Sequence, residues 1–354
     1  MPAEPDSVLD VVVVGAGQAG LAMGHSLGSC NRRFLIVDGA GEVGSAWRGR
    51  WDSLTLFTPR RFSGLEGLPF PGDPDGYPDR DEVVEYLESY AERFDLPFAL
   101  GNAVKRITEE DGHFALELED RALRARNVVV ATGPFQTPYV PELASGLGPD
   151  TTQMHSTAYR RPAEVPGRKA AVVGGGNTGF QIAKELAASH EVFLSIGSRQ
   201  KPLPQKLLGR DLFWWLTTSR ILSATAGSRL GRRLRKRETL IGSSTREVRR
   251  HGVELKPRAV SAAGRALRFE DDSEVDVDSV IWATGYRPEY SWVDLPVLDT
   301  KGWARHRRGV TDVPGFYFLG LTWQHTRGSA LIGWVKDDAE FIAKQIDERQ
   351  DGGP

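Results

Sequence analysis

The sequence predicts an α/β fold made of two Rossmann-like units, one of them inserted into the other. Two repeated patterns support this prediction. A glycine-rich turn follows an apolar strand twice, at residues 11–20 and at residues 170–179. The tripeptide Ala-Thr-Gly also ends an apolar strand twice, at residues 131–133 and 283–285. Because one Ala-Thr-Gly precedes the second glycine turn and the other follows it, the second unit is predicted to interrupt the first.

The first glycine turn has the spacing Gly-x-Gly-x-x-Gly and opens a predicted helix. In this arrangement the first glycine permits a tight turn, the second lets the backbone approach a pyrophosphate, and the third lets the helix pack on the strand. The following strand ends at Asp38, a position from which a carboxylate hydrogen-bonds the ribose of an adenine dinucleotide. The predicted binding residues of this unit are Gly15, Gly17, Gln18, Ala19, Gly20 and Asp38.

The second glycine turn predicts a second dinucleotide, so that electrons could pass between two cofactors. Its next strand ends on Gly197-Ser198-Arg199 and carries no acidic residue there. An arginine beside a serine can hold a 2′-phosphate, which favours NADP, while a solvated loop arginine is the alternative. The predicted binding residues of this unit are Gly174, Gly176, Asn177, Thr178, Gly179, Ser198 and Arg199.

Segments outside the glycine turns suit a flat ligand in the first unit. Trp47 lies in an aromatic and polar stretch that could wrap a planar group, and Ala131, Thr132 and Gly133 let a strand end turn beside one. A predicted antiparallel meander at residues 104–130 leads directly into this first Ala-Thr-Gly.

The composition narrows the function classes. The 354 residues carry a net charge of -2, which gives no reason to expect nucleic acid as a partner. No apolar run approaches the ~20 residues that span a bilayer, so stable membrane insertion is not expected and a cytoplasmic location is predicted. The single cysteine, Cys30, excludes a Cys-x-x-Cys redox pair. No His-Glu-x-x-His or other metal-ligand spacing occurs, and no metal is predicted.

Residues 229–237 form a strongly basic stretch. Such a stretch could meet an anionic membrane surface or a partner protein. The alternative is a helix that exposes a solvated basic face and turns Leu230 and Leu234 inward.

Several further motifs carry a resemblance to a known family. They are Trp51-Asp52-Ser53-Leu54, Phe57-Thr58-Pro59, the segment from His155 to Arg160, and the segment from Ala283 to Arg287. Together with the glycine turns, they make the chain similar to the flavin-containing monooxygenases, and especially to the short bacterial YUCCA-like enzymes. The family motif before the histidine normally has Phe and Gly where this chain has Pro149 and Thr151.

The resemblance implies FAD at the first glycine turn, with Trp47 and Gly320 beside it, and NADPH at the second. It implies that His155 and Tyr159 belong to a motif that places NADP and the linker between the domains. It further implies that NADPH reduces FAD and that a C4a-hydroperoxyflavin then transfers one oxygen atom from O2 to a small organic substrate.

The predicted architecture is that of the disulfide reductases, with an FAD-binding domain at residues 1–160 and 277–354 and an NADPH-binding domain at 161–276. A homodimer is a further expectation. Two other functions stay open: an NADPH-dependent flavoprotein reductase that passes electrons to ferredoxin or another acceptor, and a non-catalytic FAD- and NADP-binding sensor.

Overall fold

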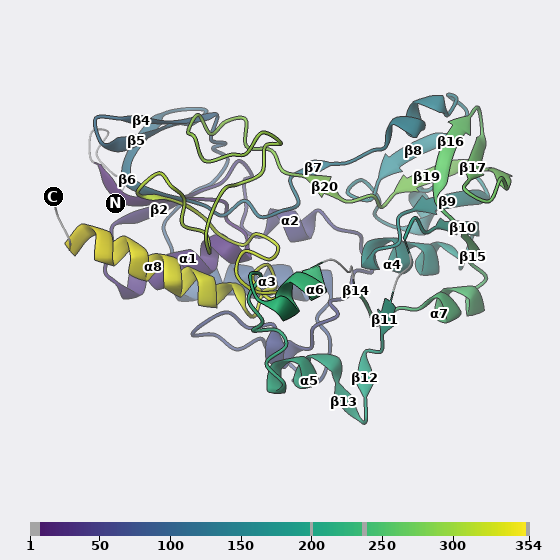
Figure 1. Cartoon of the computed structure of the whole chain (residues 1–354), viewed down its shortest axis with the longest axis horizontal. Helices are drawn as coiled ribbons and strands as arrows, with labels where there is room; N and C mark the ends of the chain where they lie inside the picture. Colours follow the sequence, from purple (N-terminus) through teal and green to yellow (C-terminus); the bar gives the residue numbers. More distant parts are fainter. Residues whose placement is uncertain (1–7, 199–200, 236–238, 352–354) are drawn as a thin grey trace.

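The computed structural model describes residues 8–198, 201–235 and 239–351. Two lobes lie side by side in Figure 1, each built on a largely parallel sheet. The first sheet has the strand order β3-β2-β1-β6-β5-β4, with β21 also paired to β6. Its strands are β1 (Leu9–Val14), β2 (Phe34–Val37), β3 (Phe98–Ala99), β4 (Arg106–Glu110), β5 (His113–Glu117), β6 (Ala122–Val130) and β21 (Phe316–Phe318).

The valine run of the first strand is explained by its burial on both faces. Val11 and Val13 belong to one apolar cluster, whereas Val12 belongs to another on the opposite face of the sheet. The first cluster is shared with the helices α1 (Gln18–Ser29), α3 (Arg80–Arg93) and α8 (Val335–Asp351). A parallel strand that is covered on both sides reads as a continuous apolar run, as here.

The predicted meander is confirmed. Strands β4, β5 and β6 pair antiparallel in sequence order. The second half of β6 then pairs in parallel with β1 on one side and β21 on the other. The meander therefore delivers the first Ala-Thr-Gly to the carboxyl end of the parallel strands, next to the first glycine turn.

The second sheet is parallel throughout and has the order β15-β10-β9-β19-β8. Helices α4 (Asn177–Leu186) and α7 (Thr245–Arg250) pack on one face, and a three-stranded meander covers the other. Its strands are β8 (Thr152–His155), β9 (Lys169–Val173), β10 (Glu191–Ser195), β15 (Glu254–Lys256) and β19 (Ser279–Trp282), and the meander is β16 (Ala259–Ala263), β17 (Ala266–Phe269) and β18 (Glu274–Asp276).

Both lobes have the same order of elements, and the pairing of their strands bears on the predicted domain bounds. Each lobe orders a glycine-turn strand, a helix, two further parallel strands, a meander and an Ala-Thr-Gly strand. Strands β8 and β19 pair within the second sheet, although the predicted edges at 161 and 276 leave both of them in the first domain. From this pairing we propose that the second unit spans about residues 152–282, wider than the predicted 161–276. The assignment of one cofactor to each unit stays a prediction.

Two short strands connect the lobes. Strands β7 (Thr137–Pro138) and β20 (Tyr286–Arg287) pair antiparallel and cross between the lobes in Figure 1. Helix α2 (Ser45–Arg48) lies near the same boundary.

A segment of the second unit returns to the first lobe. Leu212, Phe213 and Ile241 form an apolar cluster with Phe57 and Trp334 of the first lobe. We call residues 201–241 the returning segment. Its elements are β11 (Lys201–Leu203), β12 (Lys206–Leu207), β13 (Arg210–Asp211), α5 (Leu212–Thr218), α6 (Arg229–Arg235) and β14 (Thr239–Ile241).

Residues 229–235 of the basic stretch form helix α6, and Lys236 and Arg237 lie outside the described residues. The alternative in which Leu230 and Leu234 turn inward is wrong for Leu230, which is 45% exposed, whereas Leu234 is half-buried. The buried position is Gly231, where a Cβ would lie 1.9 Å from the carbonyl oxygen of Thr225. In the part of the chain that the structure describes, no helix has the length and apolar character needed to cross a membrane.

Candidate functional site

The three glycines of the first turn have different surroundings. Gly15 has a φ of +116°, and a Cβ there would lie 2.8 Å from the carbonyl oxygen of Ala131. A Cβ at Gly20 would lie 1.8 Å from the carbonyl oxygen of Gly15. A Cβ at Gly17 would meet no described atom within 4 Å. Two glycines are thus required by the packing of the protein itself, and Gly17 borders open space where a ligand could approach.

The helices that follow the two glycine turns start without a side-chain cap. The N-caps of α1 and α4 are Gly17 and Gly176, and neither helix has a described side-chain cap or an acidic residue in its first turn. Helix α3, in contrast, begins with a capping box formed by Asp79 and Glu82. The first N–H groups of α1 and α4 are therefore left to satisfy an anion such as a pyrophosphate.

Asp38 lies at the end of β2, as predicted, and contacts the glycine turn. Its Oδ2 accepts a hydrogen bond of 2.6 Å from the N–H of Ala16, and its Oδ1 accepts one of 2.8 Å from Ala40. The carboxylate is held next to the turn, where the ribose of a dinucleotide would lie. Its contact with ribose stays a prediction.

Four predicted residues meet at the start of α1. The indole N–H of Trp47 donates to Oε1 of Gln18 at 2.7 Å, and Nε2 of Gln18 donates to the carbonyl oxygen of Ala330 at 3.2 Å. Gly320 has a φ of +82°, and a Cβ there would lie 2.8 Å from the Cβ of Ala19. The first glycine turn, the aromatic loop and the C-terminal region therefore surround one helix terminus.

The two Ala-Thr-Gly turns have the same local structure. Gly133 and Gly285 have φ values of +72° and +82°, which suit glycine. Thr132 accepts a hydrogen bond of 2.6 Å from Nε2 of Gln136, and the hydroxyl of Thr284 donates to the carbonyl oxygen of Tyr139. In each turn the threonine side chain thus hydrogen-bonds to the connecting segment between the lobes, at Gln136 or at Tyr139.

The second glycine turn repeats the packing of the first. Gly174 has a φ of +138°, and a Cβ at Gly179 would lie 2.0 Å from its carbonyl oxygen. Oδ1 of Asn177 accepts a hydrogen bond of 3.0 Å from the N–H of Ile241, so this amide ties the returning segment to α4. Thr178 is half-buried in the first turn of α4. Ser198 follows β10, and Arg199 lies outside the described residues.

One cation at this site was not found from the sequence. Nη2 of Arg258 donates to the carbonyl oxygen of Gly197 at 2.6 Å, and its Cζ would lie 3.1 Å from a Cβ at Gly197. Arg258 follows β15, the neighbour of β10 in the sheet. It therefore lies at the carboxyl edge of the strands, where dinucleotides bind. The sequence shows only Lys-Pro-Arg after a short strand, and nothing there indicates which strand is adjacent.

His155 is buried at the end of β8, beside the second Ala-Thr-Gly turn. Its Nε2 donates to the carbonyl oxygen of Gly285 at 3.0 Å, and its Nδ1 accepts from the N–H of Thr157 at 3.2 Å. Burial lowers the pKa of the imidazole, and the nearby guanidinium of Arg50 acts in the same direction. Since both ring nitrogens are bonded within the protein, the geometry favours a positioning role over that of a catalytic base.

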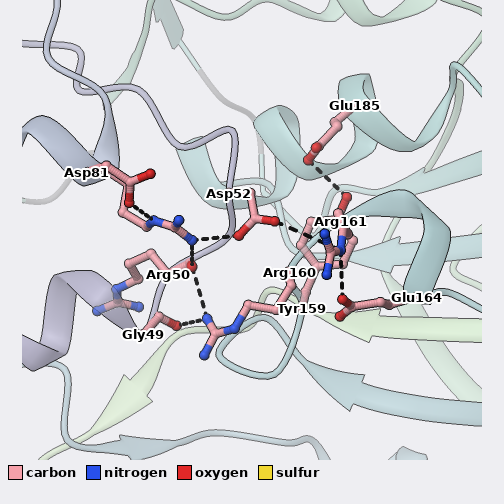
Figure 2. A network of polar contacts seen from close by, with 10 residues as sticks. Gly49, Arg50, Asp52, Asp81, Tyr159, Arg160, Arg161, Glu164 and Glu185 are labelled. Carbon is pink, nitrogen blue, oxygen red and sulfur yellow. Dashed lines mark hydrogen bonds and ion pairs between the residues drawn. The ribbon is translucent and has the colours of Figure 1, made fainter.

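Tyr159 is buried beneath the second lobe. Its hydroxyl donates to Oε2 of Glu185 on α4 at 2.9 Å (Figure 2). Only 1% of the residue is exposed. Burial raises the pKa of this hydroxyl, and the adjacent carboxylate of Glu185 raises it further. Tyr159 thus anchors the linker to α4, and its role toward NADP stays a prediction.

Arginines join the linker to the first lobe beside Tyr159. Nη1 of Arg160 donates to the carbonyl oxygen of Arg50 at 2.9 Å and also to that of Gly49 (Figure 2). Nη1 of Arg80 donates to the same Arg50 oxygen at 3.0 Å and to Oδ1 of Asp52 at 2.6 Å. This network holds the entry to the second lobe against the loop that follows α2.

An aromatic cluster lies where the returning segment meets the first lobe. The rings of Phe57 and Phe213 are 5.9 Å apart, and those of Phe213 and Trp334 are 5.8 Å apart. Trp51 belongs to another cluster, the one around Tyr159. The structure thus brings Phe57 and Trp334, which are far apart in the sequence, into one cluster.

One segment has the Gly-x-Ser-x-Gly spacing of a nucleophilic serine, but its structure does not fit that role. Gly24-His25-Ser26-Leu27-Gly28 matches Gly-x-Ser-x-Gly, but it lies inside helix α1. The hydroxyl of Ser26 donates to the carbonyl oxygen of Ala22 at 3.1 Å. It lacks the sharp strand-to-helix turn that exposes a nucleophilic serine.

Comparisons with known proteins agree with this geometry. The family model described as pyridine nucleotide-disulphide oxidoreductase matches residues 12–210. An uncharacterized CzcO-like oxidoreductase of Geobacillus kaustophilus is 44% identical, over 96% of this chain and 98% of its own. The indole-3-pyruvate monooxygenase YUCCA4 of Oryza sativa is 28% identical, over 97% and 89%. A flavin-containing monooxygenase structure from Stenotrophomonas maltophilia has a TM-score of 0.83 and 28% identity, covering 97% of this chain and 99% of its own.

Proposed function

The chain belongs to the pyridine nucleotide-disulphide oxidoreductase family, and we propose that it is an NADPH- and O2-using FAD monooxygenase of small organic substrates. It is a flavin monooxygenase-like oxidoreductase with the predicted two-unit α/β fold, as its relatives and structural neighbours show. The family, fold and enzyme predictions are thereby confirmed. The use of NADPH and O2 belongs to the proposal.

The main support is the pair of uncapped helix termini behind two glycine turns of equal geometry. FAD and NADPH are the cofactors of the proposal. The first turn, with Gly17 facing open space, Asp38 and the Trp47–Gln18 contact, would hold FAD. The amides at the start of α1 would bind its pyrophosphate.

The second turn would hold NADPH. The amides at Gly176 would bind the pyrophosphate, and Ser198, Arg199 and Arg258 would surround the 2′-phosphate of the adenosine. Arg258 has a side chain that is 58% exposed and lies 3.5 Å from Oε1 of Glu270, so it can turn toward a phosphate without losing a buried partner.

The redox chemistry would be supplied by the bound FAD. In the balanced reaction, substrate, NADPH, a proton and O2 give oxygenated substrate, NADP⁺ and water. The protein itself would position the cofactors and enclose the reacting region. His155 and Thr284 hold the second Ala-Thr-Gly turn, and the Arg50–Arg160 contacts hold the lobes together. The aromatic cluster around Phe213 would keep water from the reacting region.

Isotope transfer tests the proposal. The purified yellow protein is given NADPH, ¹⁸O2 and a panel of small thioethers, amines, ketones and α-keto acids. We expect one ¹⁸O atom in the product of at least one compound and one molecule of NADPH oxidised per product. If NADPH bleaches the flavin but ferredoxin is reduced and no compound gains ¹⁸O, the protein is the reductase. If NADPH leaves the flavin colour unchanged, both enzyme functions are wrong and the sensor function remains. A cytoplasmic location and a homodimer stay predictions.

A further inference from the structure

An exposed hairpin tip carries two neighbouring leucines. Strands β12 and β13 form a hairpin that projects from the lower edge of the molecule in Figure 1. Leu207 is 46% exposed and Leu208 is 82% exposed. A single exposed leucine on a protein surface needs no explanation, but two at the end of a projecting hairpin form an apolar point directed at solvent.

The backbone at Leu208 is unusual for a leucine. Leu208 has a φ of +48° and Gly209 a φ of +75°. A two-residue hairpin turn with both φ values positive normally takes Asn or Gly, because a Cβ is unfavourable in the left-handed region. Leu208 therefore stabilises neither the turn nor the core. An apolar side chain at this position is best explained by a binding partner that covers it.

Two tryptophans lie at the base of the tip. The indole N–H of Trp215 donates to the carbonyl oxygen of Leu207 at 2.9 Å. Trp214 lies edge-on to Trp215 at 4.7 Å, and the guanidinium of Arg210 lies 4.8 Å from the centre of the Trp214 ring. Both tryptophans are half-buried. An apolar tip with half-buried tryptophans at its base is the arrangement found at membrane interfaces.

The returning segment, which carries the tip, is rich in basic residues. Residues 201–241 hold ten of the chain's 45 Lys and Arg residues but only two of its 47 Asp and Glu residues. Asp211, the acidic residue next to the tip, is buried and accepts hydrogen bonds of 2.7 Å from the hydroxyl of Tyr77 and from the N–H of Phe213. Its carboxylate is therefore hydrogen-bonded within the protein, where it also lines the pocket beside the tip.

A pocket of about 210 Å³ opens beside the tip. It is lined by the cations of Lys206, Arg210 and Arg61, by the carboxylates of Asp75 and Asp211, and by Gly209 and Trp214. Asp75 is already paired with Arg61 at 2.6 Å. The pocket therefore offers the cations of Lys206 and Arg210 to an anionic group the size of a lipid phosphate.

We propose that this tip docks the protein on the surface of an anionic lipid bilayer. Leu207 and Leu208 enter the boundary between headgroups and acyl chains, Trp214 and Trp215 lie at the headgroup level, and Lys206 and Arg210 meet lipid phosphates. The docking is peripheral and needs no membrane-spanning helix.

Vesicle flotation tests the proposal on the FAD-loaded protein. Vesicles of phosphatidylcholine with phosphatidylglycerol are compared with vesicles of phosphatidylcholine alone. We expect binding to the anionic vesicles only, and weaker binding as salt rises. The variant Leu208→Asn removes the apolar group while placing in the turn a residue that suits a positive φ, so the hairpin should remain folded. Its partition coefficient is expected to fall about tenfold.

Control variants separate the tip from general effects. Val260 is 46% exposed on β16 of the second lobe, so Val260→Asn should bind vesicles as the unchanged protein does. The double variant Lys206→Gln and Arg210→Gln should lose binding to anionic vesicles. FAD content and melting temperature are measured for each variant to confirm folding.

Three results would overturn the proposal. The first is that the unchanged protein fails to float with anionic vesicles, and the second is that Leu208→Asn floats as well as the unchanged protein does. The third is a concentration-dependent dimer in sedimentation analysis that Leu208→Asn abolishes, because the tip would then be a contact between copies of the chain.

Discussion

A Cβ at Gly174 would lie 2.1 Å from the carbonyl oxygen of Ala283, so the second glycine turn packs directly on the second Ala-Thr-Gly turn. Gly15 has the same relation to Ala131, with a corresponding distance of 2.8 Å. The small residues that end these strands thus serve the glycine turn beside them. This reason differs from the expected one, in which the strand end makes room for a flat ligand.

Gly17→Ala should weaken FAD binding at least about tenfold and leave the fold intact. Gly17 has an ordinary φ of -86°, and a methyl group there meets no described atom within 4 Å, so only a ligand would clash. The measurement is FAD affinity by titration of the apoprotein, with melting temperature as the check on folding.

Gly28→Ala is the matched control for that variant. It lies in the same helix, also with no described atom within 4 Å of a Cβ, and should bind FAD normally. Gly15→Ala should instead lower the melting temperature, because its φ of +116° disfavours any side chain. Normal FAD affinity in Gly17→Ala would place the pyrophosphate elsewhere.

Arg258→Ala should raise the Kd for NADPH about tenfold and leave the Kd for NADH nearly unchanged, because the guanidinium is proposed to face the 2′-phosphate. Binding is measured by anaerobic titration of the oxidised protein. Arg268→Ala is the control, since Arg268 lies on β17 of the meander that follows Arg258 and pairs with Asp272 at 2.5 Å. Equal losses for both coenzymes would remove the 2′-phosphate role.

His155 should make the protein less stable in acid. Burial lowers the pKa of His155 below its ordinary value of 6.5, so the unfolded chain binds a proton more readily than the folded chain does. This contribution to stability is present above about pH 6.5 and is lost as the pH falls toward the folded pKa. In His155→Gln, the drop in melting temperature between pH 7.5 and 5.5 should be smaller than in the unchanged protein.

The comparison must be made as a difference, because burial also lowers the pKa of His306 and of His325. These two side chains contribute acid sensitivity in both proteins. An unchanged pH dependence in His155→Gln would mean that His155 titrates alike in the folded and unfolded chains.

Tyr159→Phe should lower the free energy of unfolding by about 1 kcal/mol, because the carboxylate of Glu185 loses its hydrogen-bond donor. We expect the Kd for NADPH to be unchanged, since the hydroxyl is already hydrogen-bonded to Glu185 of α4. Urea unfolding and coenzyme titration measure the two effects. A large loss of NADPH affinity at constant stability would instead support a direct role in placing NADP.

The sequence by itself determined the two glycine turns, the two Ala-Thr-Gly strand ends, the position of Asp38 and the first meander. These features depend on local backbone requirements, such as the positive φ at Gly15 and Gly174, which residue type and spacing express directly. Family likeness then led from two dinucleotide turns to FAD and NADPH.

Only the tertiary structure decided which strands share a sheet and which distant side chains meet. Strand β8 joins the second sheet through pairing with β19, more than a hundred residues later in the chain. Arg258 reaches Gly197 only because β15 lies beside β10, and Leu208 is exposed only because its hairpin projects. Such contacts depend on the packing of segments far apart in sequence, which local composition does not record.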